Sequence, residues 1–200
     1  MNTVFRSTFA GVAAGTALLG GLSAPAAAYA ARPAVRVEVQ TAAGSGCPTP
    51  ADTSVTPHLD GSGFLAVYNA FEASSPPNGN RFCNLTLKVS TDAGVHVGLR
   101  RITYRGTADL GRNSRGSFEA KYFWAGGPTA HHPGYSRTGP YSGDWERVHE
   151  LPEVHWGPCH EAQLNITQTL RAKGPGEAYI NVQSTDAGYA SIFEWVTAPC

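Results

Sequence analysis

Acidic and histidine side chains concentrate in one stretch of the sequence, between residues 144 and 161. They are Asp144, Glu146, His149, Glu150, Glu153, His155, His160 and Glu161. Imidazole and carboxylate groups are typical ligands of zinc and other transition metals. However, five residues separate His149 from His155, four separate His155 from His160, and no H-E-x-x-H motif is present. This loose spacing favours a solvated strand and turn, so we expect no metal and no cofactor. If a metal did bind, the candidate ligands would be these three histidines.

No residue type and spacing in the sequence assigns a catalytic group. The G-x-S-x-G turn of serine hydrolases is absent, as is the alternation of strands and helices that positions it. Carboxylates for glycoside hydrolysis could be paired in several ways, so no pair is indicated. A nucleophilic cysteine is excluded if all four cysteines form disulfides. We therefore favour a protein without enzymatic activity and keep a metal-dependent or carboxylate-based hydrolase as an alternative.

Aromatic side chains offer a better-motivated site. Four of them lie in or beside a Gly- and Pro-rich segment, residues 126–143: Tyr135, Tyr141, Trp145 and Trp156. A flat ring on a β-domain can stack on the apolar face of a sugar ring. The alternative is that the tryptophans belong to the core. We expect the tryptophans to be buried, Tyr135 and Tyr141 to be exposed, and the segment itself to be a surface loop.

Arginines form a local basic stretch that only Asp109 opposes: Arg100, Arg101, Arg105, Arg112 and Arg115. Such a stretch could meet the anionic groups of uronate, phosphate or teichoic acid polymers. The chain as a whole has 15 basic and 15 acidic residues, a formal net charge of +0. This balance argues against a general nucleic-acid or anionic-membrane binder. It favours a solvated strand and hairpin for the basic stretch.

The elements that would position these residues are strands. Apolar residues recur at every second position in several runs, among them Leu85–Val89, Phe118–Trp124 and Ala162–Leu170. This period is typical of antiparallel strands with one buried face. The Asp60-Gly61 pair marks a hairpin turn, and a change of parity at Arg100-Arg101 predicts a β-bulge. We predict an all-β antiparallel sandwich of about eight to ten strands, with a jelly roll equally compatible.

The N-terminus has the features of a secretory signal peptide. Arg6 precedes an apolar run from Phe9 to Leu22, and Ala28-Tyr29-Ala30 fits a cleavage site. No second apolar stretch follows that could span a membrane. We therefore expect a signal peptide at residues 1–30, an N-terminal extension at 31–43 and a single β-sandwich domain at 44–200. We expect this domain to be secreted, extracellular and monomeric.

Four cysteines lie in the part of the chain that would be secreted: Cys47, Cys83, Cys159 and Cys200. Their spacings do not match the close ligand pairs of zinc sites, and no C-x-x-C redox motif is present. An even number of cysteines in an oxidising compartment predicts structural disulfides. Of the three possible pairings we favour Cys47–Cys83 with Cys159–Cys200, one for each half of the chain.

Several motifs, in order along the chain, resemble a known family. They are Gly44–Pro48, Phe82–Leu85, Tyr104–Gly106, Ala108–Leu110, Gly139–Asp144, Trp156–Cys159, Leu164–Ile166, Ser184–Asp186, Trp195 and Cys200. This set is similar to the secreted DUF 4360 family of actinomycetes and filamentous fungi. The resemblance implies a β-sandwich with two disulfides and no particular activity. Residues 31–43 and the segment around His131-His132-Pro133 depart from the family pattern.

Compartment, fold class and loop aromatics together favour an extracellular binding module. The first candidate partner is a cell-wall or environmental polysaccharide. An effector or inhibitor that binds another protein is a further alternative. This hypothesis is an association between fold and function, so it depends on the site that the structure presents.

Overall fold

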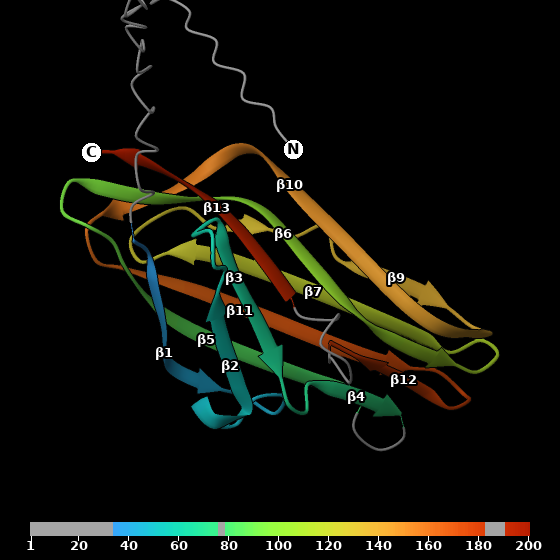
Figure 1. The fold of residues 1–200 in the computed structure, drawn as a ribbon. Coiled ribbons are helices and arrows are strands. Elements are labelled where there is room, and N and C mark those ends of the chain that lie inside the picture. The colour runs from blue at the N-terminus through green and yellow to red at the C-terminus, as the bar shows by residue number, and fades with distance from the viewer. Residues whose placement is uncertain (1–33, 76–78, 183–190) are drawn as a thin grey trace, which may run out of the picture. The chain divides into compact units, whose positions relative to one another are not determined.

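The computed structural model describes residues 34–75, 79–182 and 191–200. The expected signal peptide, residues 1–30, lies outside the described residues. Among those described, no helix is long and apolar enough to cross a membrane. Regular structure there consists of thirteen strands and one 3-10 turn, η1 (Pro50–Asp52). The strands form two antiparallel sheets (Figure 1). The predicted all-β antiparallel sandwich is confirmed, with more strands than expected.

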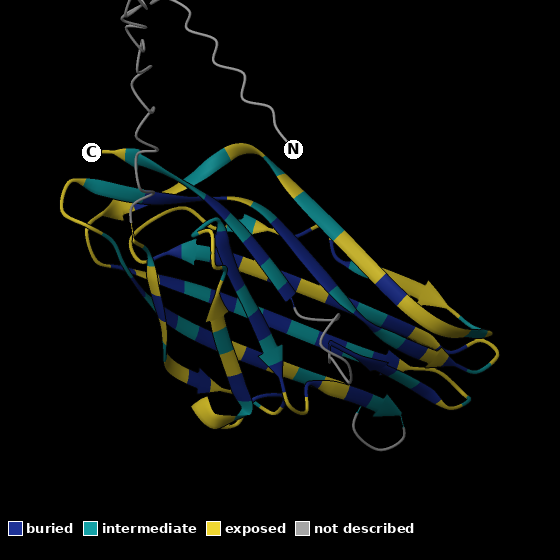
Figure 2. Cartoon of the chain, in the orientation of Figure 1, coloured by how far each residue is buried: buried dark blue, intermediate teal, exposed yellow. Residues whose placement is uncertain are grey.

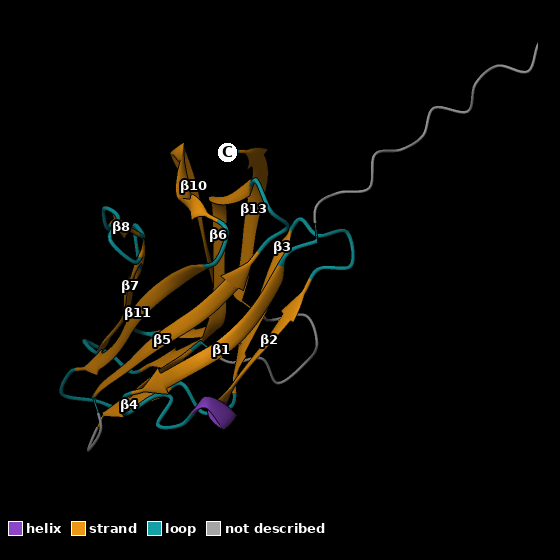
Figure 3. Ribbon diagram, turned by 90° about the vertical axis from the view of Figure 1, so that its left-hand side faces the viewer, coloured by secondary structure: helices purple, strands orange, loops and turns teal. Residues whose placement is uncertain are grey.

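The first sheet holds six strands and runs from β1 to the short strands β8 and β9. In spatial order it contains β1 (Arg36–Ala43), β5 (Asn80–Ser90), β11 (Ala162–Lys173), β7 (Arg115–Trp124) and β8 (Ala130–His131), and β9 (Tyr135–Thr138) also pairs with β7. Figure 3 shows β1, β5 and β11 side by side in this sheet. Residues 31–43, expected as an extension, thus include a strand that is hydrogen-bonded along β5.

The second sheet is built around the long strand β6 (Val95–Leu110). Its spatial order is β2 (Thr53–Pro57), β3 (Gly63–Tyr68), β13 (Ser191–Pro199), β6, β12 (Ala178–Asn181) and β4 (Glu72–Ser75), and β10 (Tyr141–Cys159) also pairs with β6. The hairpin predicted at Asp60-Gly61 joins β2 to β3. Strand β10 is mostly exposed or half-buried along its length (Figure 2).

The core lies between the inward faces of the sheets. On β5, Leu85, Leu87 and Val89 are buried, while Thr86 and Lys88 between them are half-buried on the other face. Aromatic rings fill much of the interior, and the largest fully buried side chains include Phe64, Tyr68, Tyr104, Phe118, Tyr122, Trp124 and Phe193. Burial of apolar surface on this scale is the main stabilising contribution to such a domain. The strands' period of two therefore predicts the buried face correctly.

The β-bulge predicted from the parity change is confirmed at Arg100. In the register between β13 and β6, Glu194 pairs with Arg101 and Trp195 with Leu99, so Arg100 is the extra residue. A bulge adds one residue to one strand and moves the following side chains to the other face. Leu99 and Ile102 can therefore both be buried.

Residues 126–143, expected as a surface loop, are more regular than predicted. They contain β8, β9 and the first residues of β10. Tyr135 to Thr138 pair with Phe118 to Arg115 of β7. The Gly and Pro residues concealed these strands because both types are depleted in strands and typical of turns. This pairing places β9 beside β7 and brings Tyr135 against the core.

Two disulfides close the domain. Cys47 is bonded to Cys83 at the start of β5, and Cys159 at the end of β10 is bonded to Cys200. The sequence separations are 36 and 41 residues. Chain segments belonging to the second sheet, β2, β3 and β4, lie between Cys47 and Cys83. The first disulfide therefore links the segment after β1 to β5, and it closes the loop that contains these three strands of the second sheet.

Candidate functional site

The histidines and acids of residues 144–161 lie along β10 and just beyond it. His149 accepts or donates a hydrogen bond through Nδ1 to the hydroxyl of Tyr122 on β7, and burial lowers the pKa of His149. His155 is half-buried, and burial also lowers its pKa. His160 follows the strand with a φ of 76°. Within residues 34–75, 79–182 and 191–200, no three His, Cys, Asp or Glu side chains converge as metal ligands do.

The tyrosines expected at the surface are half-buried. Tyr135 stacks on Trp145 with 4.8 Å between ring centroids. Trp145 is buried as expected, and its ring centroid lies 5.4 Å from that of Phe118. The guanidinium of Arg137 lies 4.0 Å from the centre of the Tyr141 ring. Tyr135 packs against the core because β9 pairs with β7, and Tyr141 does so because the start of β10 pairs with Leu110 of β6; the loop prediction included neither pairing.

Trp156, which we expected in the core, is 40% exposed. Its ring stacks on His96 with 4.3 Å between centroids and 11° between planes. The register places Trp156 directly opposite Gly98 of β6. A Cβ atom at Gly98 would lie 2.6 Å from the Trp156 ring, so the ring covers a glycine that has no side chain of its own. The tryptophan therefore lies on the surface of the sheet rather than between the sheets.

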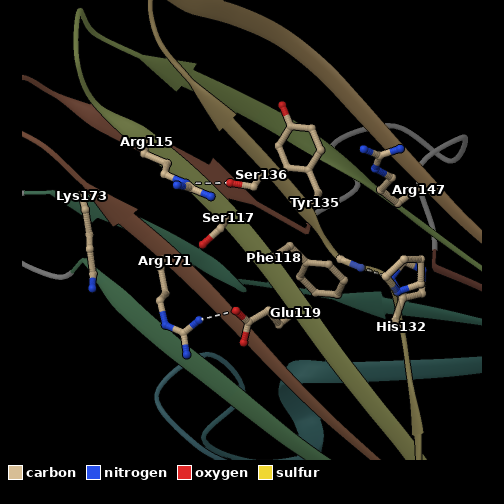
Figure 4. A pocket seen from close by; sticks show the side chains of 12 residues that line it. Arg115, Ser117, Phe118, Glu119, His132, Tyr135, Ser136, Arg147, Arg171 and Lys173 are labelled. Atoms are coloured by element: carbon tan, nitrogen blue, oxygen red, sulfur yellow. Dashed lines mark hydrogen bonds and ion pairs between the residues drawn. The ribbon is translucent and has the colours of Figure 1, made fainter.

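A pocket of about 540 Å³ opens where β7, β9 and β11 meet β10 and the turn between β8 and β9 (Figure 4). It is lined by Arg115, Ser117, Phe118, Glu119, His132, Pro133, Gly134, Tyr135, Ser136, Arg147, Arg171 and Lys173. A volume of a few hundred cubic ångströms is typical of small-ligand sites. Most of these side chains are polar or charged, so the pocket suits a ligand that forms many hydrogen bonds.

Strand register builds one wall of this pocket. Lys173 of β11 lies directly opposite Arg115 of β7, and Arg171 lies opposite Ser117. Ser117 in turn pairs with Ser136 of β9. Directly paired residues of antiparallel strands project from the same face of the sheet. Three strands that are distant in the sequence thus bring cations and hydroxyls to one surface.

Two polar contacts order the pocket wall. The Arg115 Nε atom donates a hydrogen bond to Ser136 Oγ at 2.7 Å, and Arg171 Nη1 donates to Glu119 Oε1, also at 2.7 Å. Figure 4 shows both contacts on the same side of the pocket. Each contact restricts a long side chain that would otherwise be mobile. The arginine heads are therefore held near the positions a ligand would meet.

His132 forms the buried end of the pocket and is 6% exposed. Its Nδ1 atom accepts a hydrogen bond from the Gly134 backbone N–H at 3.0 Å, which leaves the proton on Nε2. The Tyr104 and His149 rings lie 5.0 and 5.5 Å away. Burial lowers the pKa of His132 to about 4, and the neighbouring His149 acts in the same direction. The imidazole is therefore neutral at physiological pH.

Comparison with known protein families assigns the chain. Residues 33–200 match the family described as "Domain of unknown function (DUF4360)". The chain belongs to the DUF4360 family. No curated protein matches it. Among solved structures, one similar structure is that of TmCBM61 in complex with β-1,4-galactotriose, with 11% identity, a TM-score of 0.29, and coverage of 83% of this chain and 88% of that chain. A TM-score this low carries no argument about the ligand of the DUF4360 protein.

Sequence reasoning placed only one of the pocket's cations, Arg115, in a candidate basic surface. The structure separates that stretch: Arg101 and Arg105 pair across the strands with Glu150 and Glu146 of β10. The cations that join Arg115 in the pocket of the DUF4360 protein are Arg147, Arg171 and Lys173. Arg171 and Lys173 share the parity of Thr167 and Thr169 on the outward face of β11. That parity was visible in the sequence, but the neighbouring strand was not.

Proposed function

We propose that this DUF4360 protein is a secreted, non-enzymatic binding module that holds a polysaccharide in the pocket between β7, β9, β10 and β11. Two disulfides are compatible with an oxidising, extracellular compartment, which the expected signal peptide also supports. Fold alone does not identify a ligand, so the proposal depends on the pocket.

The observation that carries the proposal is the combination of groups in the pocket. Ser117, Ser136 and the arginine heads offer hydrogen bonds to a hydroxyl-rich ligand. Tyr135 also lines the pocket, from the inward-facing side of β9 opposite Phe118, and its ring is fixed by its stack on Trp145. An aromatic ring beside several hydrogen-bonding groups matches a sugar, which has apolar ring faces and polar edges. The pocket therefore fits a saccharide better than it fits a wholly apolar molecule.

We expect Tyr135→Ala to weaken polysaccharide binding about fivefold, because one ring contact contributes about 1 kcal/mol. Binding is measured by co-sedimentation of the purified, oxidised protein with chitin, cellulose and peptidoglycan. The melting temperature of each variant is measured in parallel, since Tyr135 also packs on Trp145. A loss of binding with an unchanged melting temperature supports the proposal.

Two exposed aromatic residues serve as matched variants. Phe82→Ala removes a ring that is 43% exposed on β5, outside the pocket, and is expected to leave binding unchanged. Trp156→Ala removes the exposed ring stacked on His96 and tests whether the polysaccharide stacks on that ring instead of binding in the pocket. Binding that is lost in Trp156→Ala and kept in Tyr135→Ala would contradict the pocket as the site. Absence of binding to all three polymers, together with absence of binding to the soluble polysaccharides used below, would contradict the proposed function.

A further inference from the structure

The pocket carries an excess of positive charge. Four cationic side chains and one carboxylate line it: Arg115, Arg147, Arg171, Lys173 and Glu119. The chain as a whole has a formal net charge of +0. The excess is therefore a local property, produced by folding, and it does not reflect a generally basic protein.

Strand pairing makes this arrangement unfavourable without a ligand. Lys173 and Arg115 lie directly opposite each other on the same face of β11 and β7. Like charges in such a cross-strand pair are destabilising. The same two strands pair Thr167 with Lys121 and Thr169 with Glu119, where no like charges meet. An anion bound between Lys173 and Arg115 would remove the repulsion that the register imposes.

The cations retain capacity for a ligand. Glu119 is already paired with Arg171. In the part of the chain that the structure describes, Lys173 and Arg147 form no ion pair, and the head of Arg115 meets the hydroxyl of Ser136. By contrast, Arg101 and Arg105 on β6 are paired with acids of β10. Within the described residues, Arg115, Arg147 and Lys173 therefore line the pocket without a carboxylate partner.

We infer that the pocket recognises the carboxylate groups of a uronate-containing polysaccharide, an inference that rests on the proposed function. The planar guanidinium of Arg115 presents a fork that matches a carboxylate. The hydroxyls of Ser117 and Ser136 lie beside it for the sugar hydroxyls. The carboxylate of Glu119 in the same wall would repel a densely charged polyanion. A uronate polymer carries single charges separated by neutral hydroxyl groups, so this repulsion would be weaker. The pocket's composition thus selects a sparse anion over a highly sulfated one.

The test compares polygalacturonate with the same polymer after methyl esterification, which removes its charge. Isothermal titration with the purified protein is expected to show at least tenfold tighter binding to polygalacturonate. The Arg115→Gln/Lys173→Gln variant is expected to lose about tenfold or more of that affinity. Binding should weaken between about 20 mM and about 150 mM NaCl, because salt screens exposed charges.

The matched control is Arg36→Gln/Lys88→Gln, which removes the same number of charges from the opposite end of the same sheet. Lys88 lies eight residues along β5 from Asn80, which pairs with Arg171 beside the pocket. At about 3.4 Å per residue this is a separation of about 27 Å. The control variant is expected to bind as the wild type does. Equal loss in both variants would show general attraction and overturn the inference.

The remaining outcomes separate this inference from the proposed function. Equal binding of the esterified and free polymers, with loss in Tyr135→Ala, would overturn the carboxylate assignment and keep the polysaccharide module. Dextran sulfate binding as tightly as polygalacturonate would also overturn the assignment, because it would show attraction to any polyanion. Absence of binding to all the polymers tested would overturn both.

Discussion

Replacing Cys47 and Cys83 together by alanine is expected to lower the free energy of unfolding by about 4 kcal/mol. The disulfide joins residues 36 positions apart, and the chain between them carries β2, β3 and β4. Without the bond, the unfolded chain has a higher conformational entropy, because its loop is no longer closed. Both cysteines are fully buried, so the variant also leaves poorly filled space in the core.

The measurement is urea denaturation of the oxidised wild type and the variant. Cys159→Ala/Cys200→Ala is the matched comparison, because it opens a loop of similar length, 41 residues, at exposed cysteines. It should lose the same entropic contribution and little packing, and therefore less stability than the first variant. A loss below about 1 kcal/mol in the Cys47→Ala/Cys83→Ala variant would contradict the prediction, because the loop-closure contribution alone is larger.

Acidification is expected to destabilise the protein through His132. Its pKa is lowered to about 4 by burial and by His149, whereas a histidine in the unfolded chain titrates near its ordinary pKa of about 6.5. Between these values the unfolded state binds more protons, so the free energy of unfolding falls as the pH decreases. The difference amounts to about 3 kcal/mol below about pH 4. Above about pH 6.5 this stabilising contribution is fully present.

The groups that face His132 offset this loss only in part, through a hydrogen bond with the backbone of Arg147 that raises its pKa. Tyr104 of β6 and Phe118 of β7 are buried and neutral, while His149 and Arg147 of β10 are a second titrating ring and a cation. A protonated His132 would also have to give up the hydrogen bond that Nδ1 accepts from Gly134. Protonation therefore brings positive charge into a buried site without an acid in these contacts.

The check is the free energy of unfolding of the wild type, His132→Gln and His131→Gln, measured at about pH 7, pH 5 and pH 4. His131→Gln changes the adjacent, exposed histidine and should keep the wild-type slope. His132→Gln should lose most of the dependence of the unfolding free energy on pH. The remaining dependence comes from groups such as His149, because burial lowers the pKa of that residue too. An unchanged slope in His132→Gln would show that another group is responsible.

Several features of the fold could be predicted because they depend on neighbours in the sequence. The alternation along Leu85, Leu87 and Val89 identifies a buried face without any tertiary information. The parity change at Arg100 likewise reveals a bulge within one strand. By contrast, β9 escaped prediction because its pairing partner, β7, supplies the order that its own Gly- and Pro-rich surroundings do not favour.

The candidate site shows the same division. Tyr135 was identified from its residue type, but its burial depends on Trp145 of a different strand. Trp156 was expected inside because tryptophan is usually well buried. The structure places it on the surface because it lies opposite Gly98, whose missing side chain leaves a place for the ring. Residue type alone cannot reveal such a cross-strand neighbour.

The sequence by itself determined the family, the all-β class and the presence of two disulfides, because motif order, periodicity and cysteine content are local or additive properties. Only the tertiary structure decided that Arg115, Arg147, Arg171 and Lys173 line one pocket. They come from β7, β10 and β11, and the register between β7 and β11 sets Lys173 against Arg115. Register depends on how the two buried faces pack together, and a shift of one residue would turn these cations toward the core.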